Sequence, residues 1–284
     1  MLVNKKAGNL AKAMICLGFC IISGTKLSAQ GDLMIFPKRI VFEDDKKIQE
    51  IQLANTGKDT SVYNVTFVQY RMNEFGDFKE ISEPDSGQYF ASPYLRLFPR
   101  QVVLAPNESQ IVKVQVKKTN SMKDGEYRSH IYFRAVNSNQ PLGKERNKSD
   151  STTISVKLVP VFGVTIPCII RKGVSNTSVS ISDLEYESIG DSAFYLKMSF
   201  DRRGNMSTYG DISVQYINSQ NKSLEVANVQ GFAVYAPGNV RKSKIQLKNP
   251  DAGKYIEGKF KVTYSYKGKD KPIILAEEEY AIRR

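Results

Sequence analysis

Residues 62–71 of the chain read VYNVTFVQYR, and this short β-branched and aromatic stretch decides the fold class. Comparable stretches occupy residues 48–55 (IQEIQLAN), 110–116 (QIVKVQV) and 128–136 (RSHIYFRAV). Many of them alternate apolar and polar residues, which is typical of strands with one buried face. Turn residues separate them, and no helical stripe longer than a turn or two is present. We therefore predict an all-β protein.

The second half of the chain contains seven further candidate strands in about 110 residues, which is the number expected of an immunoglobulin-like sandwich. We predict two immunoglobulin-like β-sandwich domains, one over residues 30–171 and one over residues 172–284. The candidate strands of the second domain are residues 178–181, 193–200, 211–217, 231–235, 244–247, 258–266 and 273–282.

Composition excludes several classes of protein. With 41% hydrophobic and 25% charged residues, the 284-residue chain can form cores and is not disordered. A single histidine excludes a site that needs two or three imidazole ligands, and no catalytic or nucleotide-binding motif is present. A pair of carboxylates for glycoside hydrolysis cannot be excluded by counting. We predict a non-enzymatic protein with no metal and no cofactor, and we expect no nucleic-acid partner.

The first 29 residues resemble an export signal. Lys5, Lys6 and Lys12 form a basic start without any acid, and residues 13–22 (AMICLGFCII) form an apolar run too short to span a bilayer. Cleavage after Ala29 would remove four lysines and no acid, which leaves a net charge of +8. We predict a periplasmic protein without stable membrane insertion.

Two residues with possible chemistry remain in the mature chain. Cys168 lies in an apolar run, where we expect a buried, inert thiol. His130 lies at a strand position, where we expect a partly buried histidine with its hydrogen bonds satisfied rather than a catalytic one.

One stretch is longer than an average strand. Residues 154–167 (ISVKLVPVFGVTIP) follow a polar, partly basic segment at 137–150. Two interpretations are open: a long core strand, or an edge strand that a partner must cover.

Three patterns together resemble the PapD-like family of periplasmic pilus chaperones. Residues 36–42 (FPKRIVF) are similar to the first strand of the family. Residues 93–110 (PYLRLFPRQVVLAPNESQ) are similar to its proline-bounded strand-turn-strand, and residues 127–134 (YRSHIYFR) to a later strand. The resemblance covers about residues 31–170.

The resemblance implies two domains in a boomerang arrangement, with a cleft between them. It also implies that the long strand is donated to an incomplete subunit, which would make Ile154, Val156 and Leu158 the donated side chains. Arg39 would anchor the terminal carboxylate of the subunit, because a guanidinium can grip a carboxylate through two hydrogen bonds.

The chain departs from the family pattern at the second basic anchor. The matching position is Pro160, and Lys157 would point to the opposite face unless a bulge shifts the register. An ungapped alignment would also bring Ser151, Thr153 and Ser155 to the donated positions.

We therefore carry two main hypotheses. The first is a periplasmic chaperone that binds pilin-like or other secreted β-rich subunits and reaches an outer-membrane usher through the subunit complex. The alternative is a structural or adhesive two-domain ectodomain without chaperone activity, in which the long strand is covered by its own sheet. A hydrolase built on a β-sandwich is a third, weaker reading.

Overall fold

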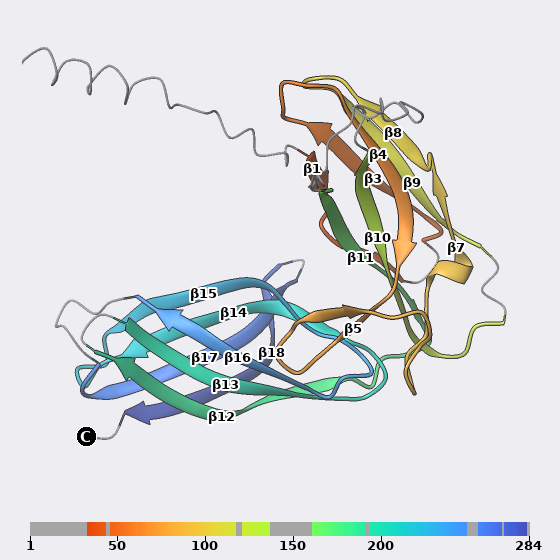
Figure 1. Ribbon diagram of the computed structural model, residues 1–284. Coiled ribbons are helices and arrows are strands. Elements are labelled where there is room, and N and C mark those ends of the chain that lie inside the picture. Colours follow the sequence, from red (N-terminus) through yellow and green to blue (C-terminus); the bar gives the residue numbers. More distant parts are fainter. Residues whose placement is uncertain are drawn as a thin grey trace, which may run out of the picture.

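The computed structural model describes residues 33–43, 46–117, 121–136, 161–190, 193–248, 255–268 and 270–282. Within these ranges the chain forms eighteen β-strands and one short 3-10 helix, η1 (Ser92–Tyr94). The strands build two sandwiches that are set at an angle to each other (Figure 1). No helix in the described ranges is long and apolar enough to cross a bilayer. The predicted all-β fold is confirmed.

Several sequence predictions lie outside the described residues. These are the export signal at 1–29 and the anchor and donated-strand candidates Ile154, Val156, Lys157 and Leu158.

The first sandwich consists of a four-stranded sheet in the order β1-β3-β9-β7 and a five-stranded sheet in the order β2-β11-β10-β4-β8. Its strands are β1 (Leu33–Phe36), β2 (Ile40–Phe42), β3 (Ile48–Asn55), β4 (Ser61–Val68), β7 (Leu95–Phe98), β8 (Gln101–Leu104), β9 (Ser109–Val116), β10 (Gly125–Val136) and β11 (Gly163–Lys172).

Alternate residues of these strands form the first core. Ile51 and Leu53 of β3 are fully buried, as are Val112 and Val114 of β9, whereas most residues between them are exposed. Phe133 of β10 is one of the largest side chains that this core encloses completely. The apolar residues that alternate with polar ones in the sequence are therefore the residues that fill the core of this sandwich.

The chain changes sheets between β1 and β2. β1 pairs antiparallel with β3, whereas β2 pairs in parallel with β11. Pro37 follows β1 directly and has no backbone N–H to continue a ladder. This change leaves Arg39 one residue before β2, at the end of the sandwich that meets the second one.

The second sandwich packs a three-stranded sheet, β12-β13-β16, against a four-stranded sheet, β15-β14-β17-β18. Phe194, Phe200, Phe260 and Tyr264 are fully buried between the sheets. The strands are β12 (Ser178–Ile189), β13 (Ala193–Arg203), β14 (Thr208–Ile217), β15 (Ser223–Val234), β16 (Val240–Leu247), β17 (Gly258–Lys267) and β18 (Pro272–Ile282).

All seven strands predicted for this half are present, but two are much longer than predicted. The ladder of β12 changes register between Ser182 and Glu185, where Asp183 has a φ of 52°. The ladder between β14 and β15 changes register twice, and Gly231 of β15 has a φ of 73°. Such bulges interrupt the period of two, so the sequence pattern reveals only the regular part of each strand.

A small hairpin links the two sandwiches. The stretch predicted as one strand over residues 62–71 is divided at Gln69 into β4 and β5 (Tyr70–Met72), and β5 pairs with β6 (Phe78–Glu80). The hairpin leaves the first sandwich and lies against the second (Figure 1).

Replacement of Phe133 by alanine should lower the free energy of unfolding by about 3–5 kcal/mol, because it leaves a cavity in a closed core. Phe98→Ala is the matched control, since Phe98 is 73% exposed on β7 and should change stability by less than about 1 kcal/mol. Urea denaturation followed by circular dichroism measures both. Equal losses in the two variants would contradict the assignment of the core.

Candidate functional site

Three strands of the first sandwich turn one face toward the second. β11 lies between β2 and β10, and Ile169 of β11 is paired with Val41 on one side and Arg128 on the other. Residues two apart on a strand share a face. We call a set of paired residues across β2, β11 and β10 on this face a row, of which Val41, Ile169 and Arg128 form one. Ile169 packs with Ala233 and Tyr235 of the second sandwich, which identifies the face as the junction.

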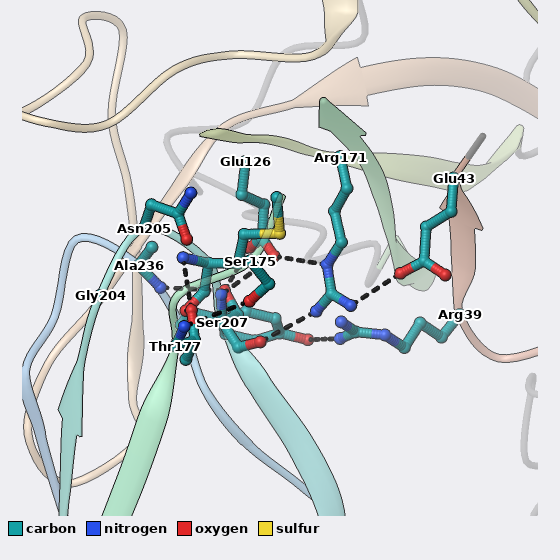
Figure 2. Close-up of polar contacts among 12 residues, drawn as sticks. Arg39, Glu43, Glu126, Arg171, Ser175, Thr177, Gly204, Asn205, Ser207 and Ala236 are labelled. Carbon is teal, nitrogen blue, oxygen red and sulfur yellow. Dashed lines mark hydrogen bonds and ion pairs between the residues drawn. The ribbon is translucent and has the colours of Figure 1, made fainter. Parts of the chain in front are cut away.

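The row at the end of β11 is ionic. The Arg171 guanidinium lies 2.7 Å from the Glu43 carboxylate and 3.1 Å from that of Glu126 (Figure 2). The side chain of Glu126 is only 1% exposed. Burial lowers the pKa of Arg171, but the two carboxylates outweigh this effect and raise it. Arg171 therefore stays charged where it meets the second sandwich.

Ser207 of the second sandwich completes this row. Its backbone N–H donates to Glu126 at 3.0 Å, and its hydroxyl donates to the same carboxylate. Its carbonyl accepts from Arg171 at 2.9 Å, and its hydroxyl oxygen accepts from the backbone N–H of Ala236 at 2.9 Å (Figure 2). One buried carboxylate thus ties both sandwiches together.

Arg39 occupies a different row. Extension of the parallel ladder by one residue brings Arg39 beside Pro167, whose partner on β10 is His130. The Arg39 guanidinium donates to the Tyr235 hydroxyl at 3.1 Å and lies 4.4 Å from the centre of the Tyr209 ring. Among the described residues, no carboxylate lies within ion-pair distance of Arg39. Its side chain is partly exposed and has donors to spare.

Arg128 is buried on the other side of Tyr235. Its guanidinium lies 4.3 Å from the centre of the Tyr235 ring and donates to the Tyr70 carbonyl at a long 3.4 Å. Its Nε and Nη1 atoms have no hydrogen-bond partner within the described part of the chain. Tyr70, Phe78 and His130 contact one another nearby as a ring cluster. Arg39 and Arg128 thus lie on either side of Tyr235, and neither has a carboxylate partner among the described residues.

His130 departs from its prediction. It is only 4% exposed, and its Nδ1 atom has no partner among the described residues, so the expectation of a satisfied histidine is wrong at this atom. Burial, followed by the charges of Arg128 and Arg39, lowers the pKa of His130 to about 3. The imidazole is therefore neutral at physiological pH. No catalytic role follows from its position inside the ring cluster.

The β5–β6 hairpin is a second contact between the sandwiches. The backbone N–H of Lys242 donates to the Glu74 carbonyl at 2.6 Å, and the side chains of these two residues form an ion pair at 2.8 Å. Gly76 lies against the Arg241 guanidinium so closely that an added Cβ atom would lie 2.6 Å from Nη2. The hairpin therefore packs against the start of β16 and is bonded to it.

The first half of β11 has a free edge. β2 covers only Cys168–Ile170, and within the described ranges residues 163–167 have no neighbour on that side. Ile166 is 3% exposed, but Val164 and Phe162 on the same face are 43% and 47% exposed. Within the described residues, the sandwich does not cover the start of this strand, so alternate apolar side chains lie exposed beside backbone groups that no described strand pairs with.

Only one of the predicted site residues, Arg39, is described by the structure. Cys168 is fully buried, and burial raises the pKa of its thiol, as expected for an inert cysteine. The sequence analysis missed Tyr209, Tyr235 and the Glu126–Arg171 pair. In the described ranges, no three His, Cys, Asp or Glu side chains converge as metal ligands would.

No protein-family model matches the chain, and no curated protein matches its sequence. Solved structures similar to it include the YadV chaperone, which is 13% identical over 88% of this chain and 100% of that one, with a TM-score of 0.40. The class 5 fimbriae chaperone CfaA is 14% identical over 85% and 97% of the two chains, also with a TM-score of 0.40. A third is the CsuC–CsuE chaperone–tip adhesion subunit pre-assembly complex of Acinetobacter baumannii, with 10% identity, coverage of 87% and 98%, and a TM-score of 0.43.

All three similar structures contain a chaperone: YadV, the class 5 fimbriae chaperone CfaA, and CsuC from the Csu pili. Identity and similarity this low do not transfer residue roles, which have to come from side-chain geometry.

Glu126→Gln should lower the free energy of unfolding by about 1–3 kcal/mol, because it weakens the bonds that a buried carboxylate makes to Arg171 and Ser207. It should also broaden the distribution of interatomic distances obtained from small-angle X-ray scattering, because the sandwiches move more freely relative to each other. Glu50→Gln removes an exposed pair with Lys113 and should change neither quantity appreciably. A scattering profile unchanged in Glu126→Gln would contradict the role of this row.

His130 should make the protein sensitive to acid. In the folded protein the pKa of His130 is lowered to about 3, whereas in the unfolded chain it is about 6.5. Below pH ~6.5 the unfolded chain therefore binds a proton at His130 that the folded chain does not bind. Stability from the neutral imidazole is complete above this pH and is lost as pH falls toward 3, by up to about 1.4 kcal/mol per pH unit. The difference in unfolding free energy between wild type and His130→Phe, measured from pH 7 to 4, isolates this effect. A difference that does not change with pH would contradict it.

Proposed function

We propose that this protein is a periplasmic assembly chaperone that binds secreted β-rich subunits at the free edge of β11 and anchors the subunit's terminal carboxylate at Arg39. One observation carries the proposal. The unpaired edge at residues 163–167 leads to a partly exposed arginine that has no carboxylate partner within the described residues.

The free edge suits the addition of a strand. Its backbone groups can form a ladder with an extended segment of a partner, and its exposed alternate side chains can fill a gap in that partner. Phe162 and Val164 are the described side chains of this kind. Burial of each could contribute about 1.5–3 kcal/mol.

The predicted donor residues extend the same face. Ile154, Val156 and Leu158 have the same parity as Phe162 and Val164, so an uninterrupted strand would present all five to one side. Lys157 has the opposite parity, which is that of Pro167 and so of the face that carries Arg39, but it lies ten residues before Pro167, about 33 Å along an uninterrupted strand. It would therefore join Arg39 as a carboxylate anchor only if the segment before β11 folded back instead of continuing as a strand. We retain the three apolar residues as the proposed donated strand.

Arg39 sets the direction of the bound segment. Arg39 lies beside Pro167, where the free edge ends, and β11 runs from that edge toward the junction. A segment whose last carboxylate meets Arg39 therefore runs in the same direction as β11. A carboxylate there would compensate a charge that the described residues leave unpaired, through two charge-assisted hydrogen bonds.

The remaining parts of the proposal follow from the sequence. We infer that residues 1–29 export the chain and that the mature protein acts without enzymatic activity. Its partners would be pilin-like or other secreted β-rich subunits, with an outer-membrane usher reached through the subunit complex. A net charge of +8 would speed encounter with acidic partners.

Affinity purification of the mature chain from its native cell envelope, with mass spectrometry, tests this function. Wild type should retain small secreted β-rich proteins at a stoichiometric level. Arg39→Ala and Val164→Asp should lose most of them, because one removes the carboxylate anchor and the other adds an unpaired charge to the apolar edge.

Arg96→Ala is the control, since Arg96 is exposed on β7 in the other sheet and should not affect binding. Retention of the same partners by all variants would refute the assigned residues. Absence of any stoichiometric partner would favour a structural or adhesive ectodomain instead.

A further inference from the structure

Tyr235 lies at the centre of the junction. It follows β15 directly, packs over Ile169 of the first sandwich and is only 6% exposed. The guanidinium carbons of Arg39 and Arg128 lie 5.6 and 4.3 Å from its ring centre. A single tyrosine of the second sandwich therefore separates Arg39 from Arg128, neither of which has a carboxylate partner in the described part of the chain.

The hydroxyl of Tyr235 has an unused donor. Its oxygen accepts a hydrogen bond from Arg39 Nη1 at 3.1 Å, but its own proton has no acceptor among the residues that the structure describes. Burial raises the pKa of Tyr235, although the two guanidinium groups act in the opposite direction. The hydroxyl therefore keeps its proton at neutral pH. A donor without an acceptor at this depth is destabilising, so a bound group that accepts from the Tyr235 hydroxyl would be favourable there.

Tyr209 fixes the orientation of Arg39. Its ring lies 4.4 Å from the guanidinium carbon, within the range of a cation–π contact. Gly231 leaves room for this ring, because an added Cβ atom would lie 3.0 Å from the Tyr209 hydroxyl. Arg39 is thus held between two aromatic side chains of the second sandwich.

Among the described residues, the row of Arg39 contains no second charged side chain. Pro167 has no polar side-chain atom, and His130 lies within the ring cluster formed with Tyr70 and Phe78. The second basic anchor that the sequence analysis looked for has no described candidate in this row. Tyr235, by contrast, already contacts the Arg39 guanidinium.

We propose that Tyr235 is the second ligand of the partner's terminal carboxylate, so that the second sandwich completes a site begun by Arg39. The inference rests on the proposed function, since it concerns the same chain end. The Tyr235 hydroxyl donates to one carboxylate oxygen while it still accepts from Arg39 Nη1, and the remaining donors of Arg39 meet the carboxylate as well. A neutral donor adds no further positive charge beside Arg128.

The assignment has a consequence for ligand choice. The site takes a free terminal carboxylate on an extended segment and discriminates against an amide, because an amide nitrogen offers hydrogens where Arg39 and Tyr235 require acceptors. A pair of defined probes therefore tests it: a ten-residue peptide of alternating apolar and polar residues with a free C-terminal carboxylate, and the same peptide with a C-terminal amide.

Fluorescence anisotropy with both labelled peptides measures the preference of the full mature chain for the acid. We expect wild type to prefer the acid about 100-fold, Arg39→Ala to lose nearly all of this preference, and Tyr235→Phe to retain only about tenfold. Tyr266→Phe removes an exposed hydroxyl on β17 and should match wild type.

The outcomes separate the two proposals. If wild type shows no preference for the acid, both the anchor at Arg39 and the role of Tyr235 are wrong. If Arg39→Ala loses the preference but Tyr235→Phe keeps it in full, the anchor stands and Tyr235 is not a ligand.

Should Tyr235→Phe unfold, 3-fluorotyrosine incorporated at position 235 replaces it in the comparison. The more acidic hydroxyl of this residue should increase the preference for the acid, and an unchanged preference would overturn the assignment.

Discussion

The arrangement of the two sandwiches depends on one buried carboxylate. Glu126 accepts hydrogen bonds from Arg171 within its own sandwich and from the backbone and hydroxyl of Ser207 in the other. Without Ser207 this buried carboxylate would lose two of the hydrogen bonds that it accepts, which would be destabilising, so the junction depends on Ser207 being in place. Because Arg171 lies on the same face of β11 as Ile169 and Pro167, the same contact fixes where the second sandwich meets that face.

The arginines that surround Tyr235 and Ser207 at the junction differ in how the described residues compensate their charge. Arg171 has two carboxylate partners, whereas Arg39 and Arg128 have aromatic faces, and Arg128 keeps two unsatisfied nitrogen atoms in the described structure. Cation–π contacts recover only part of the hydration that a buried guanidinium loses. Among the described residues, positive charge is therefore left without a paired carboxylate at the end of the β11 edge, which is where we propose that the carboxylate of a partner binds.

Much of the fold could be predicted from the sequence, because alternation and turn residues mark regular strands directly. The bulges around Asp183 and Gly231 hid parts of β12 and β15, since they break the period on which such predictions rest. Arg39 was found through a local motif. Tyr235 was not, because it is 196 residues from Arg39 and only the angle between the sandwiches brings the two together. No local pattern encodes that angle.

The β5–β6 hairpin gives the molecule a mechanical property. Two bodies joined by a single covalent link can swivel about it, but the bond between Glu74 and Lys242 adds a second fastening away from the chain crossing at residues 173–177. The angle between the two sandwiches is therefore held by contacts at separate places. A fixed angle would also limit the proposed partner by its size: a globular body too wide to fit beside both sandwiches could not bring its chain end to Arg39, however well its last residues match the edge.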